Sequence, residues 1–167
     1  MMRTFIGACS IAFVLAAAFQ LFAQNAVAIN PANSETSAAS IYTLEFSLPD
    51  SLSSNGAISI VFPDGFDLSG VSIAASSRIK GGFSTFVKGQ TVLVFRNGEG
   101  DVKQTGEKVD LMLSAVKNPE LTAGRFNLKL FIHEDSQKLH ALVQNGQYQI
   151  TNNDKGIQGA FRLSTRR

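Results

Sequence analysis

Acid–base side chains crowd at one place in the sequence, the run His133-Glu134-Asp135, which is followed by Ser136 and His140. A catalytic triad needs a nucleophile held by a base and a base oriented by an acid. Neighbouring residues do not converge by adjacency alone, and the sequence lacks a G-x-S-x-G nucleophile motif. Two histidines seven positions apart would face opposite sides of one continuous strand, and an H-E-x-x-H metal motif is also missing. We interpret the run as a solvated hairpin loop and predict no catalytic residue.

Binding chemistry for metals or cofactors is equally sparse in the sequence. The loop Asn97–Asp101 offers Glu99 and Asp101 to a calcium ion, but it lacks the ligand spacing of a calcium-binding loop. Neither G-x-G-x-x-G nor a Walker loop occurs, so nucleotide binding has no support. Cys9 is the one cysteine and lies in the N-terminal segment. We therefore predict no metal site, no cofactor and no disulfide in the exported chain.

The N-terminal segment has the pattern of an export signal. Arg3 supplies a positive start, Ile6–Ala18 is almost continuously apolar, and Ala26-Val27-Ala28 is an A-x-A cleavage site. The mature chain is thus expected to begin at Ile29, with Ala23 as an alternative last residue of the signal. A membrane anchor is the other interpretation, but the apolar run Phe5–Phe19 is shorter than the ~20 residues that a spanning helix needs.

The charge balance excludes an electrostatic nucleic-acid binder. Without Arg3 the chain has 14 basic residues (15 less one) and 13 acidic residues, interspersed along the sequence. Binding to nucleic acid would need a basic stripe that displaces counterions. The one local bias is the end of the chain, where Lys155, Arg162, Arg166 and Arg167 follow the last acid. A solvated tail explains this bias, and docking to an acidic cell surface is the alternative.

Alternation of apolar and polar residues dominates the rest of the chain. Tyr42–Leu48 places its large apolar side chains on one face and polar ones on the other, as a half-buried strand does. Ala57–Phe62 alternates as well, with Ile58, Ile60 and Phe62 on one face and Ala57, Ser59 and Val61 on the other. The same period predicts further strands, which cover Phe83–Val87, Thr91–Phe95, Val109–Ser114, Arg125–His133, Leu139–Val143 and Tyr148–Ile150. Thr91–Phe95 is apolar on both faces and is expected to be covered on both sides. Phe131 interrupts a polar row and is expected as an exposed contact.

Seven to nine short strands, with a turn about every ten residues, predict an all-β fold, a β-sandwich of two antiparallel sheets. A closed β-barrel is the alternative fold. The expected organisation is a signal peptide over 1–28, a sandwich domain over 29–152 and a basic tail over 153–167. Gly159–Leu163 in that tail is either a short edge strand or loose chain. No segment shows a helical period over three turns, and Asn145-Gly146 is expected as a hairpin turn.

Several of these strand and turn motifs resemble a repeat module of large bacterial and archaeal surface proteins. The matching segments span about Ile29 to Thr151 and are Tyr42-Thr43-Leu44-Glu45-Phe46, Gly56, Ile58-Ser59-Ile60-Val61-Phe62-Pro63, Gly65-Phe66, Asn118-Pro119, Ala123-Gly124-Arg125-Phe126-Asn127-Leu128 and Tyr148-Gln149-Ile150-Thr151. The resemblance implies an immunoglobulin-like sandwich used as an extracellular structural or adhesive unit. This chain has one copy instead of a tandem array, and it ends in the additional segment Asn152–Arg167.

These features together predict a secreted or cell-surface protein, with the periplasm as an alternative location, that is not an enzyme. Its predicted function is that of a surface or matrix structural or adhesion module. The alternatives are a carbohydrate-binding module and a filament subunit assembled by strand exchange, with Ile29–Ala39 or Gly159–Leu163 as the donor. The expected partners are an extracellular protein, a polysaccharide or copies of the chain itself. We expect no nucleic-acid partner, and membrane contact only through the export signal.

Overall fold

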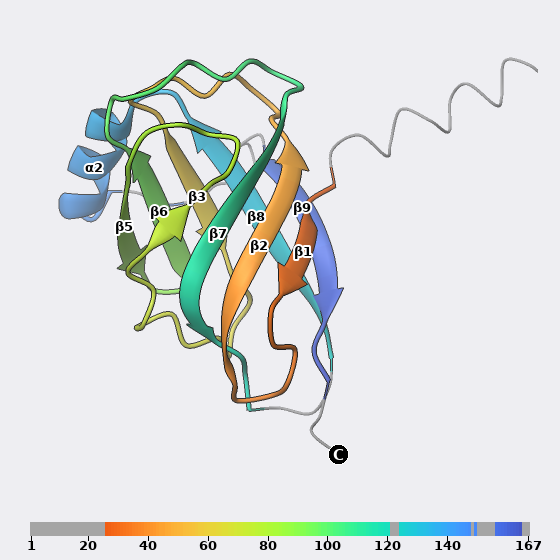
Figure 1. The fold of residues 1–167 in the computed structure, drawn as a ribbon. Coiled ribbons are helices and arrows are strands. Elements are labelled where there is room, and N and C mark those ends of the chain that lie inside the picture. The colour runs from red at the N-terminus through yellow and green to blue at the C-terminus, as the bar shows by residue number, and fades with distance from the viewer. Residues whose placement is uncertain (1–25, 121–123, 148, 150–155, 165–167) are drawn as a thin grey trace, which may run out of the picture.

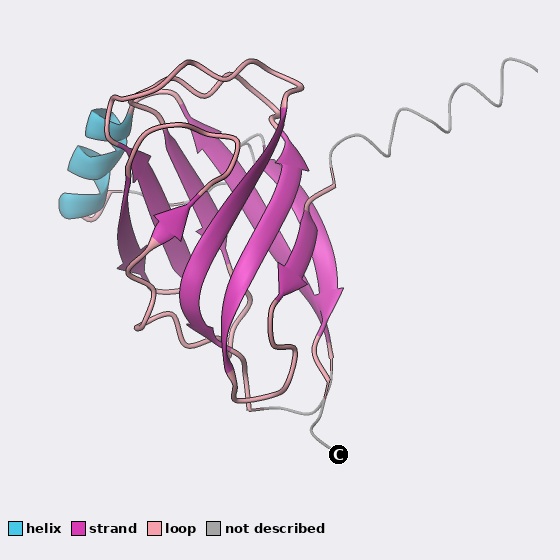
Figure 2. Ribbon diagram, viewed as in Figure 1, coloured by secondary structure: helices cyan, strands magenta, loops and turns pink. Residues whose placement is uncertain are grey.

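Two antiparallel sheets lie face to face in the computed structural model of the chain (Figures 1 and 2). The structure describes residues 26–120, 124–147, 149 and 156–164. Within these residues the sheets remain two separate layers and do not close into a barrel, so the predicted β-sandwich is confirmed. Residues 1–25 of the predicted export signal, Tyr148 and Ile150 of the last predicted strand, and residues 165–167 lie outside the described residues.

The first sheet has four strands in the order β1-β2-β7-β4. Their bounds are Ala28–Pro31 for β1, Ala39–Ser47 for β2, Lys108–Lys117 for β7 and Ala74–Ala75 for β4. The long pair β2–β7 forms its centre, with Leu44 opposite Leu111 in the register. Apolar side chains of both strands point into the sandwich and are buried, as their alternation predicts.

The second sheet has five strands in the order β5-β6-β3-β8-β9. Their bounds are Phe83–Lys88 for β5, Thr91–Arg96 for β6, Ala57–Val61 for β3, Arg125–His133 for β8 and Gly156–Arg162 for β9. Strand β9 lies inside the segment that the sequence analysis set apart as a tail. Of the two alternatives predicted for Gly159–Leu163, a short edge strand or loose chain, the structure shows the edge strand.

The core between the sheets is centred on Tyr42, which is fully buried. The rings of Phe62, Phe66 and Phe161 pack edge-on around it, with centroids 5.6, 6.2 and 5.7 Å from that of Tyr42. These aromatic residues come from both sheets and from the loop after β3, and edge-on pairs of this kind favour a fixed arrangement. The cluster of these four aromatic rings therefore helps to hold the two sheets in a fixed arrangement.

The predicted strand over Leu139–Val143 is wrong, because this segment is the helix α2, Ser136–Gln144. The side chain of Asp135 accepts hydrogen bonds from the amides of Gln137 and Lys138 and caps the helix N-terminus. Leu139 and Val143 are buried four residues apart on one helix face. A nine-residue helix shows only one such repeat, so its helical period is not distinguishable from an alternation in the sequence alone.

The expected hairpin turn at Asn145-Gly146 is wrong for the same reason. Asn145 is the C-cap of α2, and Gly146 has a φ of 70°. The amides of Gly146 and Gln147 bond back to the carbonyls of Val143 and Leu142. Asn-Gly supplies the left-handed backbone that ends a helix as readily as the one that closes a hairpin, so the dipeptide alone does not distinguish the two.

Helix α2 lies on the outer face of the five-stranded sheet (Figure 1). Its buried residues form a second apolar cluster with Ala57, Leu93 and Phe95. This cluster explains why strand β6 is apolar on both faces, as the sequence predicts. Phe131 also points to this outer face, but it is buried rather than exposed, because Gly156 of β9 lies opposite it and leaves room for its ring.

The first and last described strands, β1 and β9, meet along one border of the sandwich. The amide of Val27 donates to the carbonyl of Gln158 at 3.3 Å, and the amide of Ser164 donates to Ser34 at 2.8 Å. Strand β1 at the edge of one sheet is thereby joined to strand β9 at the edge of the other. Within the described residues, no helix has the length and apolar composition that crossing a lipid bilayer requires.

Candidate interaction surface

The acid–base residues singled out in the sequence each have a different contact in the fold. His133 ends strand β8, where its Nε2 lies 2.7 Å from Ser59 Oγ. Asp135 caps α2, and His140 sits on the exposed side of that helix with its ring 5.4 Å from the ring of Phe95. Ser59 is fully buried in strand β3, so its hydroxyl is out of reach of an external substrate. The arrangement gives these residues structural contacts with strands and helix ends.

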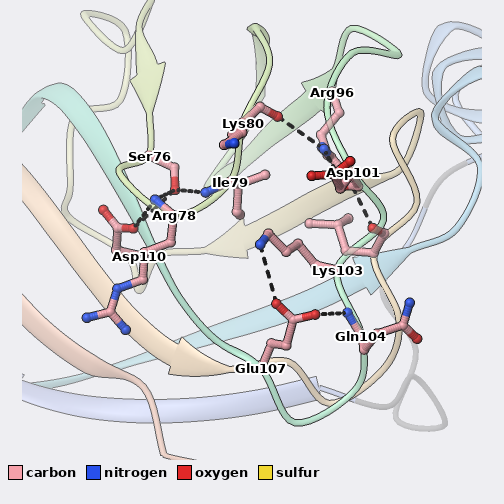
Figure 3. Close-up of polar contacts among 11 residues, drawn as sticks. Ser76, Arg78, Ile79, Lys80, Arg96, Asp101, Lys103, Gln104, Glu107 and Asp110 are labelled. Atoms are coloured by element: carbon pink, nitrogen blue, oxygen red, sulfur yellow. Dashed lines mark hydrogen bonds and ion pairs between the residues drawn. The ribbon is translucent and has the colours of Figure 1, made fainter.

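The loop considered for calcium holds a guanidinium instead. Arg96 is only 4% exposed, at the end of β6. Its Nη atoms donate to five backbone carbonyls, those of Leu52, Ser53, Lys80, Glu99 and Asp101, at 2.6–3.2 Å. Figure 3 shows the bonds to Lys80 and Asp101. Burial lowers the pKa of Arg96, and the nearby Asp101 carboxylate partly offsets this effect.

Arg96 therefore ties three loops together, and two of its acceptors are the backbone carbonyls of Glu99 and Asp101. The residues that the structure describes contain no group of three or more His, Cys, Asp or Glu side chains placed to hold a metal ion. Sequence reasoning missed this hub. The signal was there, because Arg96 continues the inward positions of Val92 and Val94 at a period of two.

A second hub forms around Asp110 on the outer face of β7. Its carboxylate accepts hydrogen bonds from the amide and hydroxyl of Ser77, the Ser76 hydroxyl and the Arg78 amide, at 3.0–3.2 Å. Figure 3 shows Asp110 beside Ser76 and Arg78. Burial of Asp110 raises its pKa, but these hydrogen bonds together outweigh burial and hold the pKa below its usual value. The carboxylate thus orders the loop that connects β4 to β5.

A third hub fixes the segment between β1 and β2. The hydroxyl of Tyr42 donates to Asn118 Oδ1 at 2.6 Å. Asn118 Nδ2 in turn donates to the carbonyls of Asn33 and Glu35 at 2.9 and 2.7 Å. Burial raises the pKa of Tyr42 far above its usual value. Because Tyr42 is fully buried, its ring is not a platform on which a sugar can stack.

A shallow groove of about 840 Å³ opens where strands β1, β2 and β7 meet the loop before β7. Its charged lining residues are Glu45, Arg78 and Lys108, so both signs of charge are present. Lys103 and Glu107 form an ion pair at 3.3 Å in the adjoining loop, where Glu107 also accepts from the Gln104 amide (Figure 3). A mixed lining of this kind does not select one class of charged ligand.

Exposed apolar side chains and strand edges are the remaining features available to a partner. Among the described residues, the large hydrophobic side chains that stay exposed are Ile41, Ile73, Phe86 and Val102. Phe86 is 44% exposed and lies in β5, at the edge of the five-stranded sheet. An edge strand presents a row of backbone donors and acceptors to solvent. Strand β5 therefore combines an apolar contact with unpaired backbone.

Comparison with known proteins leaves the family open. No protein-family model matches the chain, and no curated protein matches it in sequence. Similar solved structures include BslA, a bacterial hydrophobin, with a TM-score of 0.47 and 15% identity over 84% of this chain and 92% of that chain. The resemblance to a surface-protein repeat thus stays a prediction.

Two further similar structures are major pilins. Full-length SpaD from Corynebacterium diphtheriae has a TM-score of 0.44 and 14% identity over 84% of this chain and 33% of the pilin. The 35 kDa C-terminal fragment of GBS80 from Streptococcus agalactiae has a TM-score of 0.42 and 9% identity over 84% of this chain and 55% of the fragment. At TM-scores below 0.5, these similarities carry no argument about the activity of the chain.

Proposed function

We propose that this chain is an exported structural protein of the cell surface or extracellular matrix, which acts by contact with other macromolecules and not by catalysis. The observation that carries the proposal is the use of its buried polar side chains. Arg96, Asp110 and Asn118 all bond to the backbone of the protein's own loops. Such bonds rigidify a surface, whereas a catalytic site needs polar groups that converge on a substrate.

Contact with protein fits the described surface better than stacking on sugars. The sequence has no tryptophan and two tyrosines, of which Tyr42 is buried and Tyr148 lies outside the described residues. The exposed apolar residues are mostly aliphatic, and aliphatic side chains offer no flat ring to a sugar. We accordingly place another protein, copies of this chain included, ahead of a polysaccharide as the partner.

Export and surface contact are tested by expressing the full chain in a bacterial host. We expect the protein outside the cytoplasm, shortened at its N-terminus, and retained on cells or in their matrix. A matched chain that lacks residues 1–23 should stay in the cytoplasm. Full-length protein that remains cytoplasmic and uncleaved would overturn the export part of the proposal, and exported protein that touches neither cells nor matrix would overturn the contact part.

The non-enzymatic part is tested with substrates for esterases, glycosidases and phosphatases. We expect the same background turnover for the wild-type chain and for His133→Ala, with circular dichroism to confirm that both are folded. His140→Ala is the matched control, since this histidine lies on the exposed side of α2. A turnover well above background that His133→Ala removes and His140→Ala keeps would contradict the proposal.

A second candidate function is a filament subunit that exchanges a terminal strand. The observation that favours it is the contact between β1 and β9, because the first and the last described strands lie at one border of the sandwich. If β9 left its place, it would free edges on both sheets for a neighbour's strand. Multimers seen by size exclusion and electron microscopy should then disappear on deletion of residues 156–167. Multimers that persist after this deletion would exclude β9 as the donor.

A further inference from the structure

Strand β5 is the least protected edge among the strands that the structure describes. Of the other edge strands, β4 has only two residues, while β1 and β9 lie against each other. Strand β5 has six residues, Phe83–Lys88, with no proline and no charge before Lys88 at its end. Natural edge strands are usually blocked by short length, proline, charge or a cover. The first five residues of β5 carry neither proline nor charge, and the short strand β4 lies near β5 but is hydrogen-bonded to β7 instead.

The outward-facing backbone groups of β5 can be identified from its pairing with β6. The carbonyl of Gly82 accepts from the amide of Asn97 at 3.1 Å, and these residues continue the register in which Phe83 lies opposite Arg96. In an antiparallel ladder, hydrogen-bonded positions alternate, so Ser84 and Phe86 bond toward β6. The N–H and C=O groups of Phe83, Thr85 and Val87 then face the open edge. No described hydrogen bond reaches them on that side.

We propose that β5 pairs with β5 of a second copy of this chain, antiparallel about a two-fold axis, so that the two five-stranded sheets join into one. The inference rests on the proposed function and names the partner for one surface. A row of free backbone groups recognises an extended strand, and a second β5 can serve as that strand because Lys88 is the one charged residue in each copy. Antiparallel pairing places the two copies of Lys88 at opposite ends of the joint, where they do not repel each other.

The register of this joint follows from the faces of the strand. Residues opposite each other in a ladder point to the same face, and Phe86 points to the outer face with Leu93. If Phe86 lies opposite Phe86 of the second copy, the two rings form an aromatic pair. Phe86 is the most exposed apolar side chain of β5. Thr85 and Val87 of one copy then exchange backbone hydrogen bonds with Val87 and Thr85 of the other. A contact this short predicts weak association, with a dissociation constant of roughly 10 μM to 1 mM.

The first test is sedimentation of the full chain up to about 1 mM, the weak end of that range. We expect a concentration-dependent dimer whose dissociation constant rises at least tenfold in Phe86→Lys. Ile41→Lys is the matched control, because it places the same charge on an exposed apolar site, 51% exposed, of the other sheet. Thr85→Pro removes an outward N–H without touching the β6 ladder and should also weaken the dimer. A wild-type monomer at about 1 mM, or a dimer that persists in both β5 variants, would overturn the proposal.

The second test fixes the register by cross-linking in a Cys9→Ser background, which contains no other cysteine. The opposed β-carbons of a non-hydrogen-bonded pair lie about 4.5–5.5 Å apart, which a disulfide can bridge with a small adjustment. We expect Phe86→Cys to form covalent dimers under mild oxidation at least ten times faster than Ser84→Cys, which would lie opposite Lys88. Equal rates would overturn the register. Exported protein that binds cells but shows neither dimer nor cross-link would overturn this inference and leave the proposed function standing.

Discussion

Removal of the Tyr42 hydroxyl tests whether the buried polar hub at Asn118 organises the start of the sandwich. The change Tyr42→Phe deletes one oxygen and keeps the ring that Phe62, Phe66 and Phe161 surround. It therefore isolates the hydrogen bond of 2.6 Å to Asn118 Oδ1. No other described hydrogen bond reaches this amide oxygen, so the variant leaves it buried without a donor.

The magnitude follows from two contributions. A hydrogen bond between neutral groups adds about 0.5–1.5 kcal/mol to stability, and an orphaned buried acceptor loses about 1–3 kcal/mol of solvation. Because the second value already contains much of the first, we expect Tyr42→Phe to lower the free energy of unfolding by about 1–3 kcal/mol. A loss of 2 kcal/mol corresponds to a fall in Tm of roughly 4–8 °C for a domain of this size.

Urea unfolding of the wild type, Tyr42→Phe, Asn118→Ala and the double variant forms the assay. Asn118→Ala should destabilise more than Tyr42→Phe, because it also frees the carbonyls of Asn33 and Glu35. The two changes should be coupled by about 1 kcal/mol or more, since the residues share one bond. Ser164→Ala, which removes an exposed hydroxyl contact to Ser34, is the control and should change stability by less than about 0.5 kcal/mol. A loss below about 0.5 kcal/mol for Tyr42→Phe, or additive effects, would refute the role given to the hub.

Three further predictions concern the other buried polar groups and the chain ends. The folded-state pKa of Asp110 lies below 3.8, so the stability that its carboxylate contributes is present above this pH and is lost as the pH falls through the folded value. We therefore expect Asp110→Asn to lower the free energy of unfolding at pH 7 by about 1–3 kcal/mol and to flatten the acid limb of a stability–pH curve. An unchanged acid limb would contradict this. Arg96→Met should lower the free energy of unfolding in urea by about 3–5 kcal/mol, because it leaves loop carbonyls without a donor. Arg96→Lys should have an intermediate stability. Equal stability of the wild type and both variants would be the contrary result. A chain that starts at Ile29 lacks Val27, which is 3% exposed and packs against Gly159. We expect its free energy of unfolding to be about 1–3 kcal/mol lower than that of a chain that starts at Gln24. Equal free energies would count against this role for Val27.

The strand pattern could be predicted because each strand carries its own face in its sequence. Tyr42, Leu44 and Phe46 alternate with polar residues, and all three are buried as that alternation requires. The segment Ser136–Gln144 fails the same test. Its Leu139, Ala141 and Val143 fit a period of two, but only the first and last are buried, which fits a period of four. A short run satisfies both periods, and only the cap at Asp135 distinguishes them.

The polar hubs could be predicted only in part. The inward position of Arg96 follows from its strand, but its five acceptors come from loops 3 to 44 residues away. Asp110 lies on the outer face of β7 and looks solvent-exposed in the sequence, yet the loop Ser76–Arg78 folds over it. Local periodicity states which face a side chain takes. It does not state what covers that face.

The sequence by itself determined an all-β chain with an export-type N-terminus, alternating faces and no recognisable catalytic motif, because these properties depend on residues that are close along the chain. The strand order, the helix over β6, the contact of β1 with β9 and the exposure of β5 came from the tertiary structure alone. These properties depend on which distant segments meet, and backbone hydrogen bonds, which are the same for every residue type, do not identify their partners in advance. For that reason the open edge of β5 can be identified only from the pairing of the other strands in the folded structure.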